Sequence, residues 1–277
     1  MASRGPSDEA VKKRGPGFAM DCKKGGAVDF EGCTPCGTLR KSGGFALLQG
    51  AQRPAGRFGR IVPLREDSEL LRPERELRAE GFCCVAGVDE AGRGPLAGPV
   101  VAAAVVLPVL PELPGVFDSK QLTARQREEL YREISALPGV QIGVGIVEAA
   151  EIDEPNILRA THLAMRKALL ALEKVDFALV DGLPVKGLPV PSRNMVKGDA
   201  RCASIAAASI VAKVRRDAIM VEADARYPGY GFAEHKGYGC ASHVEALKKL
   251  GVTPIHRRSF RPVREILEPP PTQMELF

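Results

Sequence analysis

Residues 83–107 decide the fold. They read Cys83-Cys84-Val85-Ala86-Gly87-Val88-Asp89-Glu90, then a glycine-rich turn, Gly92-Arg93-Gly94-Pro95, and then the run Pro99–Leu107. The first apolar stretch predicts a strand that ends at Asp89-Glu90, and the Val/Ala-rich run predicts a second, buried strand. Two expected strands separated by a glycine-rich turn, the first of them ending in two carboxylates, are therefore the starting point.

The residues that follow alternate between helical and strand patterns. Three further strands are expected at 141–147, 177–180 and 194–197, and helices at 123–137, 153–172, 203–225 and 242–250, with Thr123 as an N-cap. A shorter helix is plausible within 65–80. Early strands followed by alternating helices and strands predict an α/β fold with a mixed five-stranded sheet flanked by helices.

Four carboxylates lie at or just beyond the expected strand ends. Asp89 and Glu90 close the first strand, Asp181 closes the strand at 177–180, and Asp199 precedes the helix at 203–225. Ligand sites of open α/β sheets cluster outside strand ends, so the four could converge. Converging carboxylates require a cation, and oxygen-only ligands favour Mg²⁺ or Mn²⁺.

Each carboxylate also has a structural alternative. Asp181 before Gly182 fits a turn, and Asp199 fits an N-cap of the following helix. The Asp89-Glu90 pair could be merely solvated. The shared placement at strand ends favours the metal site over these readings.

The first 80 residues differ from the rest. Residues 1–64 hold 11 Lys/Arg against 5 Asp/Glu and 12 of the 29 glycines, and they show little periodicity. We expect residues 1–80 to be a disordered or weakly structured extension, 81–266 to be the folded domain, and 267–277 to be a flexible tail. The lone Cys33-Thr34-Pro35-Cys36 pair has only Cys22 nearby, which is too few ligands to predict a zinc site.

Composition indicates the compartment. The seven cysteines are an odd number and form no secreted disulfide framework. No apolar run is long enough to span a bilayer, and no signal peptide is evident. We expect a cytoplasmic protein that does not bind membranes.

Several long motifs together resemble the bacterial ribonuclease HII family, a type 2 ribonuclease H. They are Ala86–Val100, Asp118-Ser119-Lys120, Ile152-Asp153 with Asn156-Ile157-Leu158, Val180-Asp181-Gly182, Lys197-Gly198-Asp199, Ser204–Val214 with Arg216-Asp217, and His235–Gly239. The similarity covers roughly residues 82–265. It implies a ribonuclease H-like fold with a small helical C-terminal portion, and a monomer.

The resemblance also implies the chemistry. Asp89, Glu90, Asp181 and Asp199 would be both the catalytic residues and the ligands of two divalent ions. The expected reaction is hydrolysis of the RNA strand of RNA–DNA hybrids and cleavage 5′ of ribonucleotides embedded in duplex DNA, leaving 3′-hydroxyl and 5′-phosphate ends. The expected role is ribonucleotide removal during DNA replication and repair.

In the family, segments matching Gly92-Arg93-Gly94 and Tyr238 read the junction from RNA to DNA. Glycines let backbone groups approach a sugar closely, and the 2′-hydroxyl distinguishes RNA from DNA. Taken without the resemblance, the same residues would be a tight turn with a surface arginine and a half-buried ring.

Basic residues supply further candidates for substrate binding. Two clusters, within 193–216 and 248–264, can hold phosphates, although charge runs usually form solvated surfaces. Lys120, Lys213 and Lys236 lie inside the matched motifs and are the expected phosphate contacts.

The C-terminus ends in Gln273-Met274-Glu275-Leu276-Phe277 after three prolines. Gln273, Leu276 and Phe277 resemble the short peptides with which bacterial repair proteins bind the DNA sliding clamp. The alternative is a frayed terminus.

Three other functions remain open. The chain could be a catalytically inactive nucleic-acid-binding module of the same fold, although all four carboxylates are present. It could be another ribonuclease H-like nuclease such as a junction resolvase, although Gly92-Arg93-Gly94 and Tyr238 argue against this. A zinc module at the N-terminal cysteines could be an accessory to either.

Overall fold

The computed structural model describes residues 68–109 and 122–268. A five-stranded mixed sheet forms the centre of this part of the chain, in the order β3-β2-β1-β4-β5. Its strands are β1 (Val85–Ala91), β2 (Val100–Val106), β3 (Gln141–Val147), β4 (Phe177–Asp181) and β5 (Ser192–Met195). Strand β1 pairs antiparallel with β2 and parallel with β4, and β5 runs parallel to β4. The expected mixed α/β sheet is confirmed.

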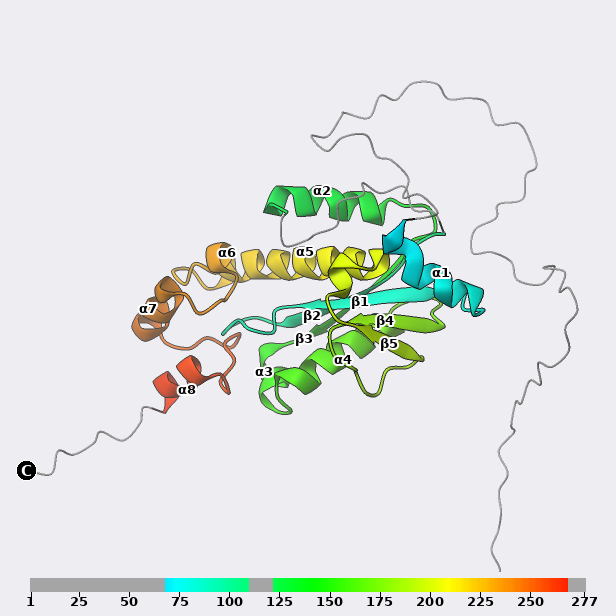
Figure 1. Cartoon of the computed structure of the whole chain (residues 1–277). Coiled ribbons are helices and arrows are strands. Elements are labelled where there is room, and N and C mark those ends of the chain that lie inside the picture. The colour runs from blue at the N-terminus through cyan, green and yellow to red at the C-terminus, as the bar shows by residue number, and fades with distance from the viewer. Residues whose placement is uncertain (1–67, 110–121, 269–277) are drawn as a thin grey trace, which may run out of the picture. The chain divides into compact units, whose positions relative to one another are not determined.

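Helices cover both faces of the sheet (Figure 1). The long helix α5 (Ala203–Arg226) lies across β1 and β2, with α2 (Ala124–Ser135) beside it. Helix α4 (Ile157–Leu170) packs on the other face against β2 and β3, after the short α3 (Ala149–Asp153). Thr123 caps α2 through the backbone N–H of Gln126, as predicted.

The helix expected at 153–172 starts later, at Ile157, because the separate short helix α3 ends at Asp153, and this is a correction. Pro155 has no N–H to donate, and Asn156 adopts a left-handed φ of 97°. The Asn156 side chain then accepts from the N–H groups of Leu158 and Arg159 and starts α4 anew. The predicted fifth strand also lies two residues earlier, at Ser192–Met195.

Strand β1 and helix α5 approach each other unusually closely at Gly87. A Cβ on Gly87 would lie 2.1 Å from the backbone carbon of Ser204, at the start of α5. Only glycine leaves room for this crossing. The contact fixes where the first turn of α5 lies relative to the end of β1, where Asp89 and Glu90 follow.

An N-terminal helical segment joins the same body. A 3-10 turn, η1 (Glu69–Leu71), leads into α1 (Arg72–Ala79), so structure begins ahead of the boundary we expected at residue 81. Glu74 of α1 is 1% exposed, and its Oε1 accepts from the N–H and the hydroxyl of Ser204, at 2.9 and 2.7 Å. A carboxylate thus sits on the N-terminal turn of α5, where the helix dipole favours negative charge.

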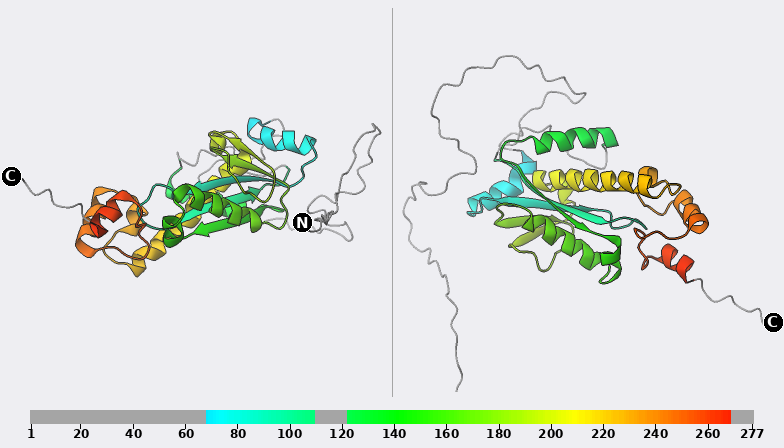
Figure 2. Two further views of the ribbon diagram at one scale, coloured as in Figure 1. Left: turned by 90° about the horizontal axis from the view of Figure 1, so that it is seen from below. Right: turned by 180° about the vertical axis from the view of Figure 1, so that it is seen from behind.

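The C-terminal residues form a small helical group at the far end of α5 (Figure 2). It contains α6 (Phe232–His235), α7 (Ala241–Leu250) and α8 (Arg261–Leu267). Phe232 and Tyr230 pack with Met220 of α5, while Leu247 and Val263 join the two last helices. The predicted helix at 242–250 and the helical C-terminal portion are confirmed.

Candidate active site

Asp89 and Asp181 lie next to each other across two parallel strands. Val88 of β1 pairs with Val180 of β4, so the next residue of each strand is an aspartate at the same end of the sheet. Asp89 and Glu90 belong to the last three residues of β1, and Asp181 ends β4. The sequence placed these three carboxylates at strand ends, and the register brings them to one edge.

Asp199 lies in the turn that connects β5 to α5. This turn is a 3-10 helix, η2 (Gly198–Ala200), and it is tied to β4 because the Gly198 N–H donates to Asp181 Oδ1 at 2.6 Å. Asp199 is 6% exposed. The N-cap of α5 is Cys202, not Asp199, so the capping alternative is wrong. We call Asp89, Glu90, Asp181 and Asp199 the acidic edge.

The acidic edge concentrates negative charge in a partly buried place. Burial, and then the charges of Glu90 and Asp181, raise the pKa of Asp89 well above its usual range. The Glu90 N–H donates to Asp89 Oδ1 at 2.7 Å and partly offsets this rise, as does Ser209. Burial also raises the pKa of Glu90, against the opposing effect of Arg93 at 3.2 Å. Carboxylates that disfavour their own ionisation in this way are suited to a bound cation.

The donor chemistry fits a hard divalent ion, although no closed metal site is preassembled. Within residues 68–109 and 122–268, no three His, Cys, Asp or Glu side chains already converge as a metal-binding group. The acidic edge offers oxygen donors from three separate segments of chain, which is the donor type that Mg²⁺ and Mn²⁺ take.

A loop and a tyrosine lie beside the acidic edge. We call residues 92–99, which join β1 to β2, the recognition loop, after the role that the resemblance implies for it. A Cβ built on Gly94 would lie 3.8 Å from the Tyr238 ring, and the Leu96 N–H donates to the Gly237 carbonyl at 2.8 Å. Tyr238 is 47% exposed, so its ring is available to a ligand. The structure thus brings together the two segments that the sequence singled out for junction reading.

Histidines fix the backbone around Tyr238. His243 Nδ1 lies 2.9 Å from the Tyr238 carbonyl, and its Nε2 lies 3.1 Å from His256 Nε2. The Thr253 N–H donates to His256 Nδ1, so His256 is left to donate through Nε2 and His243 through Nδ1. Burial lowers the pKa of His256 to about 4, which keeps it neutral. Sequence reasoning missed these contacts because Tyr238, His243 and His256 lie in three different segments of the chain.

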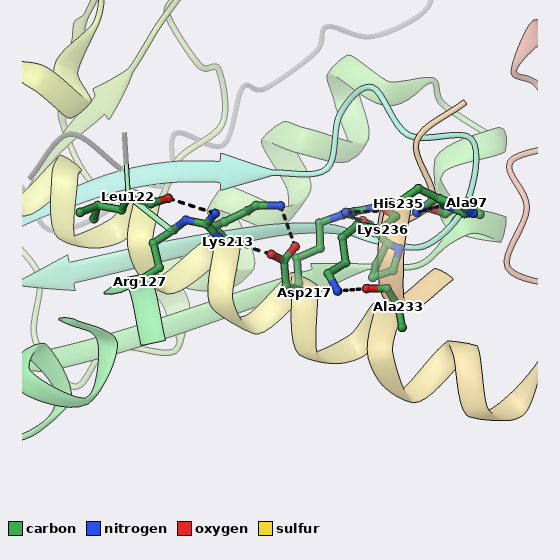
Figure 3. Close-up of polar contacts among 11 residues, drawn as sticks. Ala97, Leu122, Arg127, Lys213, Asp217, Ala233, His235 and Lys236 are labelled. Atoms are coloured by element: carbon green, nitrogen blue, oxygen red, sulfur yellow. Dashed lines mark hydrogen bonds and ion pairs between the residues drawn. The ribbon is translucent and has the colours of Figure 1, made fainter. Parts of the chain in front are cut away.

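The predicted phosphate-contact lysines are already engaged (Figure 3). Lys213 Nζ lies 2.7 Å from Asp217 Oδ1, and Arg127 pairs with the other oxygen of the same carboxylate at 3.5 Å. The Lys236 ammonium donates to the Ala233 carbonyl. Lys120, the tail residues Gln273, Leu276 and Phe277, and the Cys33–Cys36 pair lie outside the described residues.

The two basic clusters require a correction. Arg216 and Arg257 counted among their possible phosphate contacts, but they are 1% and 0% exposed. Both guanidinium groups point inward onto backbone carbonyls, because each arginine is anchored beneath the recognition loop. The alternation of buried and exposed neighbours, with Arg215 and Arg258 exposed, could not be read from a run of charges.

No helix in the described parts of the chain is long and apolar enough to cross a membrane.

Comparison with known proteins gives one consistent family. Residues 86–263 match the family model described as Ribonuclease HII. The curated Ribonuclease HII of Geobacillus kaustophilus is 59% identical over 224 residues, which cover 80% of this chain and 85% of that protein.

Solved structures share the fold. Ribonuclease H2 of Pyrococcus horikoshii superposes with a TM-score of 0.54 at 30% identity, covering 66% of this chain and 96% of that one. The PCNA:RNase HII complex of Archaeoglobus fulgidus gives 0.54 at 24% identity, covering 64% and 95%. Bst-RNase HIII in complex with Mn²⁺ gives 0.54 at 17% identity, covering 66% and 69%. The last two support the fold alone, and together the three confirm the expected ribonuclease H-like fold.

Proposed function

The chain belongs to the ribonuclease HII family, and we propose that it cuts 5′ of single ribonucleotides in duplex DNA. This activity would add to the one that the chain shares with the family, whose members are endonucleases that cleave the RNA strand of RNA–DNA hybrids. The products would carry 3′-hydroxyl and 5′-phosphate ends. The observation that carries the proposal is the placement of the acidic edge beside the recognition loop and Tyr238. One surface then holds both the cutting groups and the groups that identify a ribonucleotide.

The acidic edge would hold two divalent ions, Mg²⁺ or Mn²⁺. When bound, such ions lower the pKa of water and stabilise the leaving oxygen of an in-line phosphodiester displacement. The protein's own contribution is orientation. Gly198 fixes one oxygen of Asp181, and the Glu90 N–H and Ser209 fix Asp89. Arg93 Nη1 holds Glu90 at 3.2 Å and also places a positive charge where a phosphate would approach.

The recognition loop would identify the ribonucleotide. Gly94 carries no side chain, so its backbone can approach the sugar that bears the 2′-hydroxyl. The Tyr238 ring lies against Gly94 and can stack on the next sugar, where a second 2′-hydroxyl would be crowded. Lys213 and Lys236 flank this surface as weaker phosphate contacts, together with Lys120.

A DNA duplex that contains one ribonucleotide tests the proposal, with Mg²⁺ or Mn²⁺ present. We expect a single cut 5′ of the ribonucleotide, lost in Asp89→Asn and kept in Asp224→Asn, a partly exposed aspartate of α5. If the wild type cuts all-RNA hybrids and leaves this duplex intact, the proposed substrate is wrong. If the duplex is bound and no substrate is cut with either metal, the chain is an inactive binding module.

A sliding clamp is the proposed partner, through Gln273, Leu276 and Phe277. The proposal rests on the sequence of this peptide and on the Archaeoglobus fulgidus neighbour, which was solved as a PCNA:RNase HII complex. A labelled peptide of residues 269–277 should bind the source organism's clamp saturably. Deletion of Leu276 and Phe277 should abolish that binding, and equal binding without them would refute the proposal. We further propose a cytoplasmic monomer, which size-exclusion chromatography at assay concentration would test.

A further inference from the structure

Two arginines are fully buried beneath the recognition loop, and neither belongs to the cutting machinery described above. Arg216 projects from α5, and Arg257 lies between α7 and α8. They are among the largest side chains that are completely enclosed. Burying a guanidinium ion costs several kcal/mol unless its N–H groups are satisfied. The contacts that satisfy these two groups therefore indicate what the arginines do.

Arg257 binds the loop from both of its ends. Its Nη2 donates to the Gly92 carbonyl at 2.6 Å and its Nη1 to the Arg93 carbonyl at 2.9 Å. Its Nε donates to the Gly98 carbonyl at 3.0 Å. Three divergent bonds from one planar group fix the distance between the start and the end of the loop, which a single ammonium could not do.

Arg216 repeats the arrangement from the side of α5. Its Nε and Nη2 donate to the carbonyls of Pro99 and Ala97, at 3.1 and 3.2 Å. Its Nη1 donates to the Lys236 carbonyl at 3.0 Å, and its guanidinium carbon lies 5.9 Å from the centre of the Tyr238 ring. One side chain therefore ties the loop to the segment that carries Tyr238.

The two guanidinium groups are close enough to repel. Burial and the charge of Arg216 lower the pKa of Arg257 to about 9. The segment that bears Arg257 is clamped in turn, since Asp153 accepts from the N–H groups of Arg258 and Ser259, both at 2.9 Å. The fold thus holds two like charges together under one loop, and five loop carbonyls turn toward them.

The direction of these carbonyls determines which backbone N–H groups of the loop face a ligand. In a trans peptide the C=O and the following N–H point in opposite directions. Because the carbonyls of Gly92 and Arg93 point at Arg257, the N–H groups of Arg93 and Gly94 point away from it. Arg93 and Gly94 are exposed, and Gly94 lies against Tyr238.

We propose that Arg216 and Arg257 are positioning residues for ribonucleotide recognition, which turn the N–H groups of Arg93 and Gly94 toward the 2′-hydroxyl and its phosphate. The proposal rests on the proposed function of the loop and names what sets its conformation. Gly92 contributes to the same arrangement, because only glycine leaves room for the Arg216 side chain. It has a φ of +94°, and a Cβ there would lie 2.0 Å from Arg216 Nε.

Lysine substitutions test the proposal with controls on the neighbouring residues. Arg257→Lys and Arg216→Lys keep the positive charge and remove the divergent bonds, whereas Arg258→Lys and Arg215→Lys alter exposed side chains one residue away. Each variant is assayed on a duplex with one ribonucleotide and on an all-RNA hybrid, with kcat and KM measured separately. The single ribonucleotide offers one register, while the all-RNA strand offers many, so a misplaced loop should harm the first substrate more.

We expect Arg257→Lys and Arg216→Lys to lower the ratio of kcat/KM for the single ribonucleotide to kcat/KM for the hybrid by about 10-fold or more, since small misplacements cost this much. The controls should stay within about 2-fold, the range of an exposed charge pair. Hydrogen exchange of residues 91–99 should become faster in the two buried-site variants only. An unchanged ratio in variants whose loop exchanges faster would overturn the proposal, and so would loop exchange as slow as in the wild type.

The outcomes separate this proposal from the proposed function. If the wild type does not cut the single ribonucleotide, the proposed function fails, and the present proposal fails with it. If the wild type cuts and both substrates decline equally with thermal stability, only the positioning role is refuted. Hydrogen exchange also detects a variant that fails to fold, because exchange then accelerates over the whole chain.

Discussion

The acidic edge and the recognition loop meet at the end of β1, yet they are held in opposite ways. The acidic edge gathers carboxylates in a place where burial, and then their mutual repulsion, raises the pKa of Asp89. The recognition loop rests on two buried cations, Arg216 and Arg257, whose bonds to carbonyls close the loop from within. One region gathers acidic groups for which burial disfavours the ionised form, while the other carries two buried cations that hold its backbone in place.

This difference predicts how each region responds to change. Removal of a carboxylate should relieve strain in the fold and abolish chemistry. Removal of a loop contact should leave cleavage of an all-RNA hybrid largely intact and lower the preference for a single ribonucleotide. The substitutions below test that contrast, beginning with the largest expected effect.

Asp89→Asn should cost on the order of 10³-fold in the rate of cleavage, because a group that orients the reacting centre is lost. Stability should move the other way. A carboxyl whose pKa is raised by folding takes up protons on folding, so the free energy of unfolding falls as pH rises from about 3.9 through the raised value. In EDTA at neutral pH, Asp89→Asn should therefore melt above the wild type.

The gain in melting temperature should shrink toward pH 4 and also when Mg²⁺ is added to the wild type. Thermal unfolding over this pH range, with and without the metal, measures both trends. A variant that is less stable than the wild type at every pH would show that the carboxylates are not in conflict, and the contrast between the two regions would collapse.

Gly94→Ala should lower the activity on a single ribonucleotide and leave the fold intact. The added Cβ meets only the Tyr238 ring at 3.8 Å, an ordinary contact. It would nevertheless hold a sugar away from the backbone, so kcat/KM on a single ribonucleotide should fall about 10²-fold. Gly87→Ala is the matched opposite, since its Cβ would lie 2.1 Å from the backbone of Ser204 and should unfold the protein. Equal losses of stability in both variants would contradict this distinction.

Sequence reasoning found the acidic edge because its information is local. A carboxylate at the end of an apolar strand can be recognised from a few consecutive residues. The parallel register of β1 and β4 adds only that Asp89 and Asp181 lie side by side. The loop itself was also found, since Gly92-Arg93-Gly94 is contiguous.

The support of the loop was not found, because its parts are far apart in the chain. Arg257 and Gly92 are separated by 165 residues, and a buried arginine has the same letter as a phosphate-binding one. The start of α4 after Asn156, four residues later than expected, depended on a positive φ, which a helical pattern of apolar residues does not reveal. Two local runs of basic residues thus suggested phosphate contacts at Arg216 and Arg257, where the fold has two buried cations.

Glu74→Gln extends the contrast to the N-terminal turn of α5, which packs against β1 at Gly87. The buried Glu74 carboxylate accepts from Ser204 and lies on the positive end of a 24-residue helix. Loss of its charge should cost about 1–2 kcal/mol of stability. Cleavage by the folded protein should be unchanged. The control is Glu76→Gln on the same helix, whose carboxylate makes only exposed pairs with Arg72. Denaturant unfolding compares them, and equal stability would show that α1 is dispensable.

Lys213→Gln should give the smallest effect. It measures the long-range attraction of the protein for phosphates, as distinct from the effects of the acidic edge and of the recognition loop. Lys213 is paired with Asp217, so much of its charge is already neutralised, and only a residual attraction for a phosphate remains. We expect a change of a few-fold in KM and at most about one unit in the salt dependence of binding. Neither kcat nor the preference between substrates should move, because Lys213 contacts neither the acidic edge nor a loop carbonyl through any described bond. Binding to a hybrid measured over a range of salt concentrations, with Lys248→Gln as the exposed control, checks this. A large loss of kcat would instead place Lys213 among the groups that orient the scissile phosphate. Substrate binding would then have to break the ion pair between Lys213 and Asp217.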